Sequence, residues 1–183
     1  VTAWTSAPLS AIVAGILQPS QNWIAEQLVR TLGMEKEGNG SWAAGIRAER
    51  RFLIDSMKVD STTFNLRDAS GLSAQNLLTP MAIVQLLAYV RQQPWAAAYR
   101  AALPTPGLPR STLSNRLEGF EGKIFAKTGT ISNVASLSGY VTTQSGRELI
   151  FSILVNSSGR PSAPVRRAID ALVTALALQR DWE

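Results

Sequence analysis

The sequence predicts an α+β fold in which an antiparallel sheet is flanked by helices. Residues 124–156 hold three β-rich runs, and the last two surround the turn-forming stretch "TQSGR". Apolar residues at helical spacing occur before these runs, between residues 9 and 103, and again after them, between residues 162 and 178. Three consecutive antiparallel strands, preceded and followed by helices, form a layered α+β arrangement.

The composition is that of one folded unit. The chain has 183 residues, of which 45% are hydrophobic and only 17% charged, as expected for a globular protein with a sizeable core. The sequence has no internal repeat and no linker long enough to separate a second domain. Residues 1–183 therefore make one domain or one large part of a domain.

The residue types that are missing narrow the chemistry. The sequence has no histidine and no cysteine, which excludes a Ser–His–Asp triad, a thiol nucleophile, a disulfide and a zinc site of the usual ligands. Acid–base chemistry must then come from lysine, tyrosine or a carboxylate. The net charge of +5 suits an anionic partner, but the densest basic patch, residues 47–51, is interrupted, so nucleic-acid binding is not expected.

The N-terminal part predicts an edge strand and two helices. The opening "VTAWTSAPL" alternates small, polar and apolar residues up to Pro8, which favours a short edge strand. The apolar stretch "SAIVAGILQ" predicts a buried helix that stops at Pro19. Residues 22–32 show a helical face that Gly33 closes.

Two longer helices are predicted in the middle of the chain. After a loop, Ser41 is expected to cap a helix that reaches Met57 and carries Trp42 on its inner stripe. The polar stretch "LRDASGLSAQNLLTP" predicts a loop with turns. Its last two residues, Thr79 and Pro80, have the hydroxyl and proline typical of the N-cap and first position of a helix.

The last part of the chain carries the predicted sheet. A short helix over residues 95–103 precedes the breaking stretch "PTPGLPRS", and the strand with Lys127 follows. Residues 136–143 and 148–156 then predict an antiparallel hairpin. A final helix is expected from about Ser162 to Leu178.

Two polar clusters stand out in this apolar chain. Residues 20–22, Ser-Gln-Asn, lie at a loop–helix junction, and residues 127–130, Lys-Thr-Gly-Thr, follow an apolar run. Taken alone, the first cluster could simply cap a helix. The second could be a solvated strand end in which Gly129 marks a bulge. In a chain without histidine, however, a lysine of lowered pKa can serve as a general base, if other cations and desolvation disfavour its charge.

The two clusters in this order resemble the second and third motifs, SxN and KTG, of the penicillin-recognising serine enzymes. Three stretches sharpen the resemblance: "PSQNWIAEQLVRTLG", "DASGLSAQNLLTP" and "GKIFAKTGTISNVASLSGYV". Together they resemble the D-alanyl-D-alanine carboxypeptidase/endopeptidase family, peptidase family S13, which comprises the low-molecular-mass class C penicillin-binding proteins. The resemblance covers nearly the whole chain. It implies the C-terminal part of a penicillin-binding protein/β-lactamase-like transpeptidase domain.

The resemblance implies catalytic roles for Ser20, Asn22 and Lys127. Ser20 would relay a proton toward the leaving D-alanine, and Asn22 would hold the lysine base and the substrate amide. Lys127 would place a second positive centre beside that base. With Thr128 and Thr130, it would also grip the carboxylate that ends the substrate.

The resemblance also assigns the neighbouring positions to substrate binding. Gly129 would let the substrate lie along the strand as an added antiparallel strand, and the Thr130 N–H would form half of an oxyanion hole. Asp68, Ser70 and Gly71 are expected to shape the cleft, either through direct contact with the substrate or by forming an Asx-type turn.

The sequence departs from the family pattern in two places. Gln21 stands where the family often has Asp, and this change is expected to affect local packing only. Ala69 stands where relatives commonly carry glycine. If that position needs a positive φ, alanine costs about 1 kcal/mol.

The nucleophile of the family is not found in this sequence. No serine is followed three residues later by lysine, so the SxxK motif that supplies nucleophile and base is absent. The opening residues have neither the layout of a signal peptide nor an initiating methionine. We therefore expect residues 1–183 to be the C-terminal portion of a longer enzyme, with the SxxK segment and inserted domains upstream, and the chain alone to be inactive.

The expected function is that of a serine-type D-Ala-D-Ala carboxypeptidase or endopeptidase that cleaves peptidoglycan peptides through an acyl-enzyme. Two alternatives stay open: a non-catalytic binding module, and a related acyl-serine hydrolase such as a β-lactamase or esterase. The implied partners are stem peptides ending in D-Ala-D-Ala, β-lactam antibiotics and the upstream part of the same precursor. No cofactor and no metal are implied, and the expected location is the cell envelope, periplasmic or otherwise extracytoplasmic.

Overall fold

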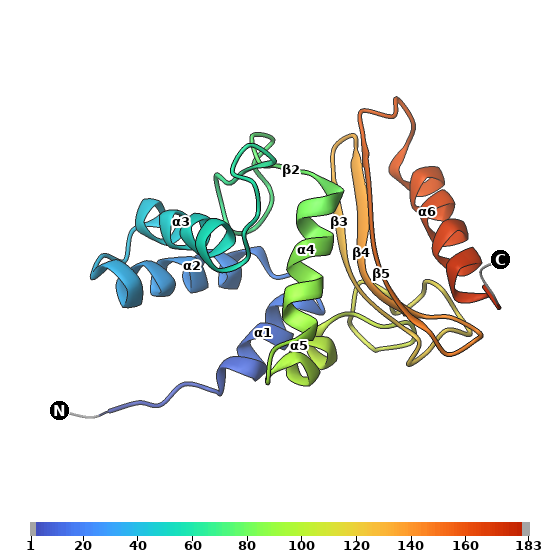
Figure 1. The fold of residues 1–183 in the computed structure, drawn as a ribbon, viewed down its shortest axis with the longest axis horizontal. Helices are drawn as coiled ribbons and strands as arrows, with labels where there is room; N and C mark the ends of the chain where they lie inside the picture. Colours follow the sequence, from blue (N-terminus) through green and yellow to red (C-terminus); the bar gives the residue numbers. More distant parts are fainter. Residues whose placement is uncertain (1–2, 181–183) are drawn as a thin grey trace.

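The computed structural model describes residues 3–180, and in it the helices α1–α3 lie at one end and the sheet with α6 at the other (Figure 1). The elements in chain order are α1 (Leu9–Leu17), α2 (Asn22–Glu37), α3 (Trp42–Arg51), the π-helical η1 (Phe52–Ser56), β1 (Phe64–Asn65), β2 (Leu77–Leu78), α4 (Pro80–Arg91), α5 (Ala96–Ala102), β3 (Ile124–Ile131), β4 (Val134–Thr142), β5 (Glu148–Asn156) and α6 (Ser162–Ala177). The predicted α+β fold is confirmed. No helix in the described part of the chain is long and apolar enough to cross a membrane.

The main sheet is antiparallel, with strand order β3–β4–β5. Its register places Lys127 opposite Ser138 and Gly129 opposite Ser136. The predicted hairpin is confirmed, because β4 and β5 pair along their whole lengths around the turn. Within the described residues, β3 is an edge strand of this sheet, which leaves one side of it open to other partners.

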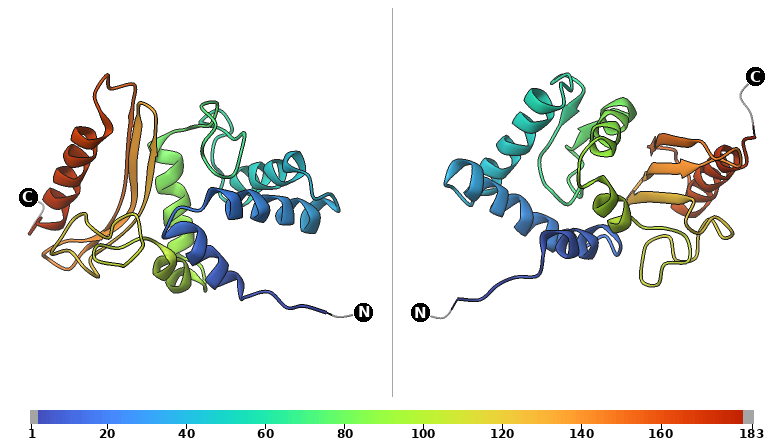
Figure 2. Two further views of the ribbon diagram at one scale, coloured as in Figure 1. Left: turned by 180° about the vertical axis from the view of Figure 1, so that it is seen from behind. Right: turned by 60° about the horizontal axis from the view of Figure 1, so that its bottom comes forward.

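Helices cover both faces of the main sheet. On one face, Ile124 and Ala126 of β3 are fully buried in a core that includes Ile169 and Val173 of α6. Figure 2 shows α6 on the side of the sheet that faces away from α1–α3. On the other face, the Tyr140 O–H donates to the carbonyl of Leu87 in α4 at 2.8 Å. Alternate residues of β3 therefore point to opposite layers, as the pleat requires.

The helices α2 and α3 pack closely through two glycines. A Cβ at Gly33 would lie 2.7 Å from the backbone N of Gly45, and a Cβ at Gly45 would collide with the backbone of Val29. The prediction that Gly33 ends its helix is therefore wrong: α2 continues to Glu37, and the left-handed Gly38, with φ of 66°, ends it. Gly33 lacks a side chain because α3 lies against it, and not because the helix stops there.

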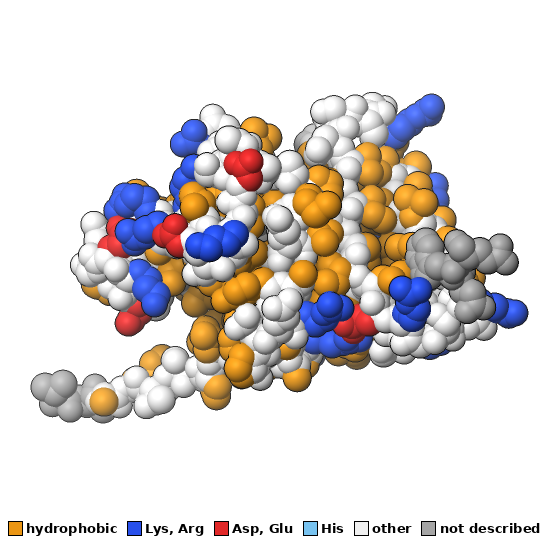
Figure 3. Space-filling view, in the orientation of Figure 1, with side chains coloured by type: hydrophobic (Ala, Val, Ile, Leu, Met, Phe, Trp, Pro, Cys, Tyr) orange, Lys and Arg blue, Asp and Glu red, His pale blue; other side chains and the backbone are white. Residues whose placement is uncertain are grey.

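Charged side chains gather over the α2–α3 end of the molecule (Figure 3). There the Glu37 carboxylate accepts from Arg47 at 2.5 Å and from Arg51 at 2.7 Å. The helix capped by Ser41 ends as a π-helical turn at Ser56, close to the predicted boundary. Trp42 is 53% exposed, so its predicted place on the inner stripe is wrong.

Two local predictions from the N-terminal half are wrong for a shared reason. Residues 3–8 form no strand and extend away from the body of the protein, with Trp4 97% exposed (Figure 1). An alternating pattern becomes a strand only where a neighbouring strand offers hydrogen bonds, and no described strand lies beside this segment. Conversely, the predicted loop over residues 66–80 contains β2, because β1 lies alongside to pair with it.

Candidate active site

Ser20 lies in the sharp junction between α1 and α2. Its backbone is left-handed, with φ of 62°, and the next N–H, that of Gln21, donates to the Ile16 carbonyl at 2.9 Å. The N-cap of α2 is Gln21, and no side chain caps that helix end. The helix-capping interpretation of residues 20–22 is therefore wrong for Ser20. Asn22 is exposed as the first residue of α2, two positions after Ser20.

Lys127 contacts Ser20, which lies 107 positions earlier in the sequence. The Lys127 Nζ donates to Ser20 Oγ at 2.7 Å and to the Thr128 carbonyl at 2.7 Å. Phe125, which shares the β3 face of Lys127, and Leu17 at the end of α1 pack against the same buried apolar cluster. The roles that the resemblance assigns to Ser20 and Lys127 require them to lie close together, and this expectation is confirmed.

Lys127 is a half-buried cation without an anionic side chain beside it. None of the ion pairs found among residues 3–180 includes it. Burial lowers the pKa of Lys127 to about 8, because desolvation disfavours the ammonium form. The side chain is therefore still mostly charged at pH 7, and it can offer that charge to an anionic ligand.

The outer edge of β3 presents backbone groups next to Lys127. The Ala126 N–H points away from β4 and donates to the Pro104 carbonyl at 2.9 Å. In an antiparallel ladder the backbone groups of alternate residues point the same way, so those of Thr128 and Thr130 also face this outer side. The Thr128 O–H donates to the Thr112 hydroxyl at 2.8 Å, and Thr130 is exposed.

Gly129 lies against Ser136, its partner on β4. A Cβ at position 129 would collide with the Ser136 hydroxyl, which would have to rotate away. The β3–β4 register runs without interruption from Ile124 to Ile131, so Gly129 marks no bulge. The bulge interpretation is therefore wrong.

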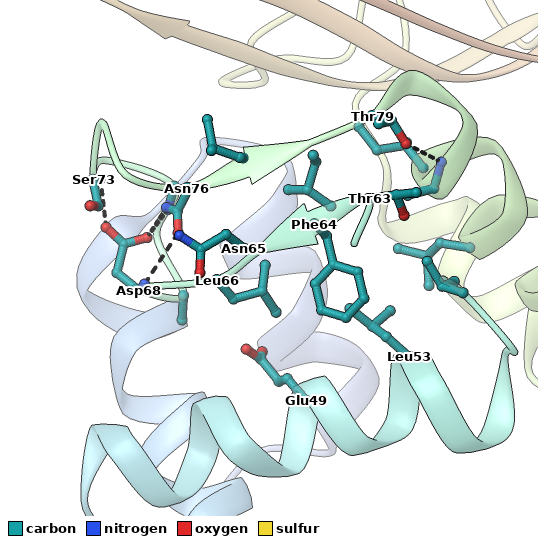
Figure 4. Close-up of a pocket in the computed structure, with 18 of the residues that line it drawn as sticks. Glu49, Leu53, Thr63, Phe64, Asn65, Leu66, Asp68, Ser73, Asn76 and Thr79 are labelled. Atoms are coloured by element: carbon teal, nitrogen blue, oxygen red, sulfur yellow. Dashed lines mark hydrogen bonds between the residues drawn. The ribbon is translucent and has the colours of Figure 1, made fainter. Parts of the chain in front are cut away.

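The loop over residues 68–76 is organised by the Asp68 carboxylate (Figure 4). One oxygen accepts from the Gly71 N–H at 2.7 Å and from the Asn76 Nδ2 at 2.6 Å, and the other accepts from the Ser73 N–H at 2.6 Å. Asp68 thus spends its hydrogen bonds within its own loop, as an Asx-type turn does. This geometry favours the turn interpretation of Asp68 over direct contact with a ligand.

Ser70 and Ala69 are held to α2. Their N–H groups donate to the same Glu26 carboxylate oxygen, at 2.9 Å and 3.2 Å respectively. The left-handed position in this loop is Gly71, with φ of 79°, and Ala69 is not left-handed. The expected cost of alanine at position 69 therefore does not arise.

The Glu49 carboxyl lies under the 68–76 loop and lines a groove between α3 and this loop (Figure 4). Burial, together with the negative charges of Glu26 and Asp68, raises the pKa of Glu49 to about 7. The sequence analysis missed Glu26, Glu49 and Thr112. For Glu26 a signal existed: it lies four positions after Asn22, one helical turn further along the same face.

The geometry can now be compared with known proteins. A model of the D-Ala-D-Ala carboxypeptidase 3 (S13) family matches residues 1–176. The chain is 41% identical to a D-alanyl-D-alanine carboxypeptidase of Actinomadura sp. (strain R39), over 94% of this chain and 32% of that protein. It is 33% identical to the carboxypeptidase DacB of Mycolicibacterium smegmatis, over 93% of this chain and 38% of that protein. The chain thus spans about a third of the length of these relatives.

Solved structures share the fold. Penicillin-binding protein 4 (dacB) of Haemophilus influenzae, complexed with a β-lactam, superposes with a TM-score of 0.82 at 23% identity, over 95% of this chain and 42% of that one. The penicillin G acylated Bd3459 predatory endopeptidase of Bdellovibrio bacteriovorus superposes with a TM-score of 0.74 at 21% identity, over 97% of this chain and 48% of that one. The predicted penicillin-binding-protein fold is confirmed.

Proposed function

The chain belongs to the D-Ala-D-Ala carboxypeptidase 3 (S13) family, and from this premise we propose that it forms the SxN and KTG side of the active site of a serine-type D-Ala-D-Ala carboxypeptidase or endopeptidase. The complete enzyme hydrolyses peptidoglycan stem peptides through an acyl-enzyme in the cell envelope. The observation that carries the proposal is the 2.7 Å contact of Lys127 Nζ with Ser20 Oγ, which joins the two motifs in space.

The contact suits Ser20 for a proton relay. Because the Lys127 Nζ donates to Ser20 Oγ, the Ser20 O–H remains available to donate elsewhere. In the proposed reaction Ser20 passes its proton to the amide nitrogen of the leaving D-alanine and takes one from the general base. Asn22 presents its amide near the same junction and holds the base lysine and the substrate amide.

The charge of Lys127 suits the C-terminal carboxylate of the substrate. The ammonium is partly buried and has no acidic side chain beside it, so an incoming carboxylate meets an uncompensated positive charge. Thr128 and Thr130 add hydroxyl donors at the same strand end. Asp68, Ser70 and Gly71 act indirectly, because they determine the shape of the loop that borders the cleft.

The open edge of β3 suits an extended peptide. The outward backbone groups of Thr130 can pair with a substrate strand, and its N–H supplies half of the oxyanion hole. Gly129 has no side chain, so the substrate can lie along this stretch of strand. The substrate therefore binds as an added antiparallel strand, with its carboxylate toward Lys127.

The nucleophile comes from a segment upstream of this chain, which carries SxxK in the complete protein. β-Lactams acylate that serine, in keeping with the penicillin G acylated relative. A non-catalytic module would keep the contacts of Ser20 and Lys127 without this serine.

The test uses the full-length protein and the isolated 183-residue chain, each treated with labelled penicillin and with a peptide ending in D-Ala-D-Ala. We expect the full-length protein to be labelled and to release D-alanine, and the isolated chain to do neither. Peptide binding without labelling would identify a binding module. Rapid penicillin turnover without D-alanine release would identify a β-lactamase instead. Labelling of the isolated chain would overturn the upstream position of the nucleophile.

A further inference from the structure

Thr112 lies between the two walls of the proposed site and touches both. Its hydroxyl accepts the Thr128 O–H at 2.8 Å, which ties it to β3. Its backbone N–H donates to the carbonyl of Gln18 at 2.9 Å, in the junction that carries Ser20. One residue from a third segment, the connection between α5 and β3, thus joins two parts of the chain more than a hundred positions apart.

The segment around Thr112 is well anchored. Its neighbour Leu113 is fully buried in the core beneath the sheet, and the Leu113 N–H donates to the buried Ser111 hydroxyl at 3.3 Å. Four residues further on, Arg116 forms two hydrogen bonds with the Asp170 carboxylate of α6, at 2.6 and 3.1 Å. Thr112 is therefore a rigid support and not part of a mobile loop.

Thr128 is a half-buried residue within β3, and without a partner its side chain could adopt more than one of the staggered rotamers. The contact with Thr112 selects one of them for Thr128. Each hydroxyl can donate or accept, so the pair survives when Thr128 turns its proton toward a ligand: Thr112 then becomes the donor. A partner that can reverse its role keeps the Thr128 oxygen in place both with and without a carboxylate.

We propose that Thr112 is a positioning residue for the carboxylate-binding end of the site, which acts by holding the Thr128 hydroxyl. This inference rests on the proposed function for its kinetic consequence but not for its structural one. Thr112 itself does not touch the substrate. Its effect should therefore be transmitted entirely through Thr128.

The structural test measures the side-chain rotamer of Thr128 in the full-length protein, from the three-bond couplings of its methyl carbon. Wild-type protein and Thr112→Ser, which keeps the hydroxyl, should show one dominant rotamer. Thr112→Val keeps the shape and the backbone bond to Gln18 but removes the acceptor, and it should show rotamer averaging. Thr105→Val is the matched control, because the buried Thr105 hydroxyl of the same connection has no partner among the described residues. A single Thr128 rotamer in Thr112→Val would overturn the proposal even if the protein had no peptidase activity.

The kinetic test compares KM and kcat for a peptide ending in D-Ala-D-Ala. Loss of one neutral hydrogen bond to a carboxylate-binding group should raise KM about fivefold and leave kcat nearly unchanged. A merely structural role would instead lower the amount of active enzyme and leave KM at its wild-type value. In a Thr128→Val background, Thr112→Val should have no further effect on KM. An additive increase in that double variant would show that Thr112 acts by another route.

Discussion

Replacement of Lys127 by alanine should slow the acylation of the full-length protein by penicillin about 10²- to 10³-fold. The substitution removes an ammonium that lies 2.7 Å from both Ser20 Oγ and the Thr128 carbonyl. Loss of one preorganised donor at a site of developing charge costs about 2.7–4 kcal/mol, and about 1.4 kcal/mol corresponds to a tenfold change in rate. No other described cation forms a bond to Ser20 that could take its place.

Stopped-flow measurement with a fluorescent penicillin would give the acylation rate constant. Lys127→Met keeps most of the buried stem, so it separates loss of charge from loss of packing, and it should be nearly as slow as Lys127→Ala. Lys123→Ala, an exposed lysine just before the same strand, is the matched control and should react at the wild-type rate. A Lys127→Ala protein that is acylated within about threefold of the wild-type rate would remove Lys127 from the mechanism.

The same residue predicts a pH dependence. The pKa of Lys127 is lowered by burial to about 8, so its positive charge is lost as the pH rises through that value. The acylation rate of the wild-type protein should fall above pH 8, and this fall should be missing in Lys127→Met. A decline of equal size in both proteins would assign it to another group.

Three further substitutions test the scaffold around the site. Gly45→Ala should destabilise the protein by about 1–3 kcal/mol in urea unfolding, because the added Cβ meets the α2 backbone. Gly15→Ala is the control and should be neutral or stabilising, because a Cβ at this helical position has nothing within 4 Å. Equal effects of the two substitutions would refute the packing argument. Because the pKa of Glu49 is raised to about 7, the folded state loses stability as the pH rises from 4.5 to 7. Glu49→Gln should therefore make the thermal unfolding temperature depend less on pH over this range. An unchanged pH dependence would contradict this prediction. Glu26→Ala should speed the hydrogen exchange of the two loop amides that donate to the Glu26 carboxylate, and Glu26→Gln should preserve their protection because it keeps an accepting oxygen. Glu35→Ala, at an exposed position of the same helix, should have no effect. Unaltered exchange in Glu26→Ala would show that other contacts hold the loop.

The strands could be predicted from local signals, and the meeting of the two motifs from the resemblance to the penicillin-recognising serine enzymes. The alternating runs and the turn "TQSGR" determine the hairpin, and Ser20 and Lys127 were expected together because proton transfer needs them within reach. Gly33 was misassigned because a glycine after a helical run looks the same whether it ends the helix or admits a neighbouring one. Only the approach of α3 distinguishes the two cases.

The contacts of the supporting residues could not be predicted for a related reason. Glu26 and Thr112 bind partners 43 and 16 positions away. The spacing of Glu26 from Asn22 indicates its face of α2, but no local pattern indicates which residues Glu26 or Thr112 contacts. The role of Asp68 was left between two alternatives because a turn and a ligand contact use the same residue type. Its three hydrogen bonds within the loop favour the turn.

The left-handed backbone of Ser20 has an energetic consequence for position 20. Residues other than glycine cost about 1 kcal/mol in this conformation, and asparagine is the side chain that tolerates it best. Selection for folding alone would therefore favour glycine or asparagine at this junction. A serine there sacrifices some stability, and the side chain that it retains is a single hydroxyl directed at Lys127. At position 20, the residue that would be best for stability therefore differs from the residue that the proposed reaction needs.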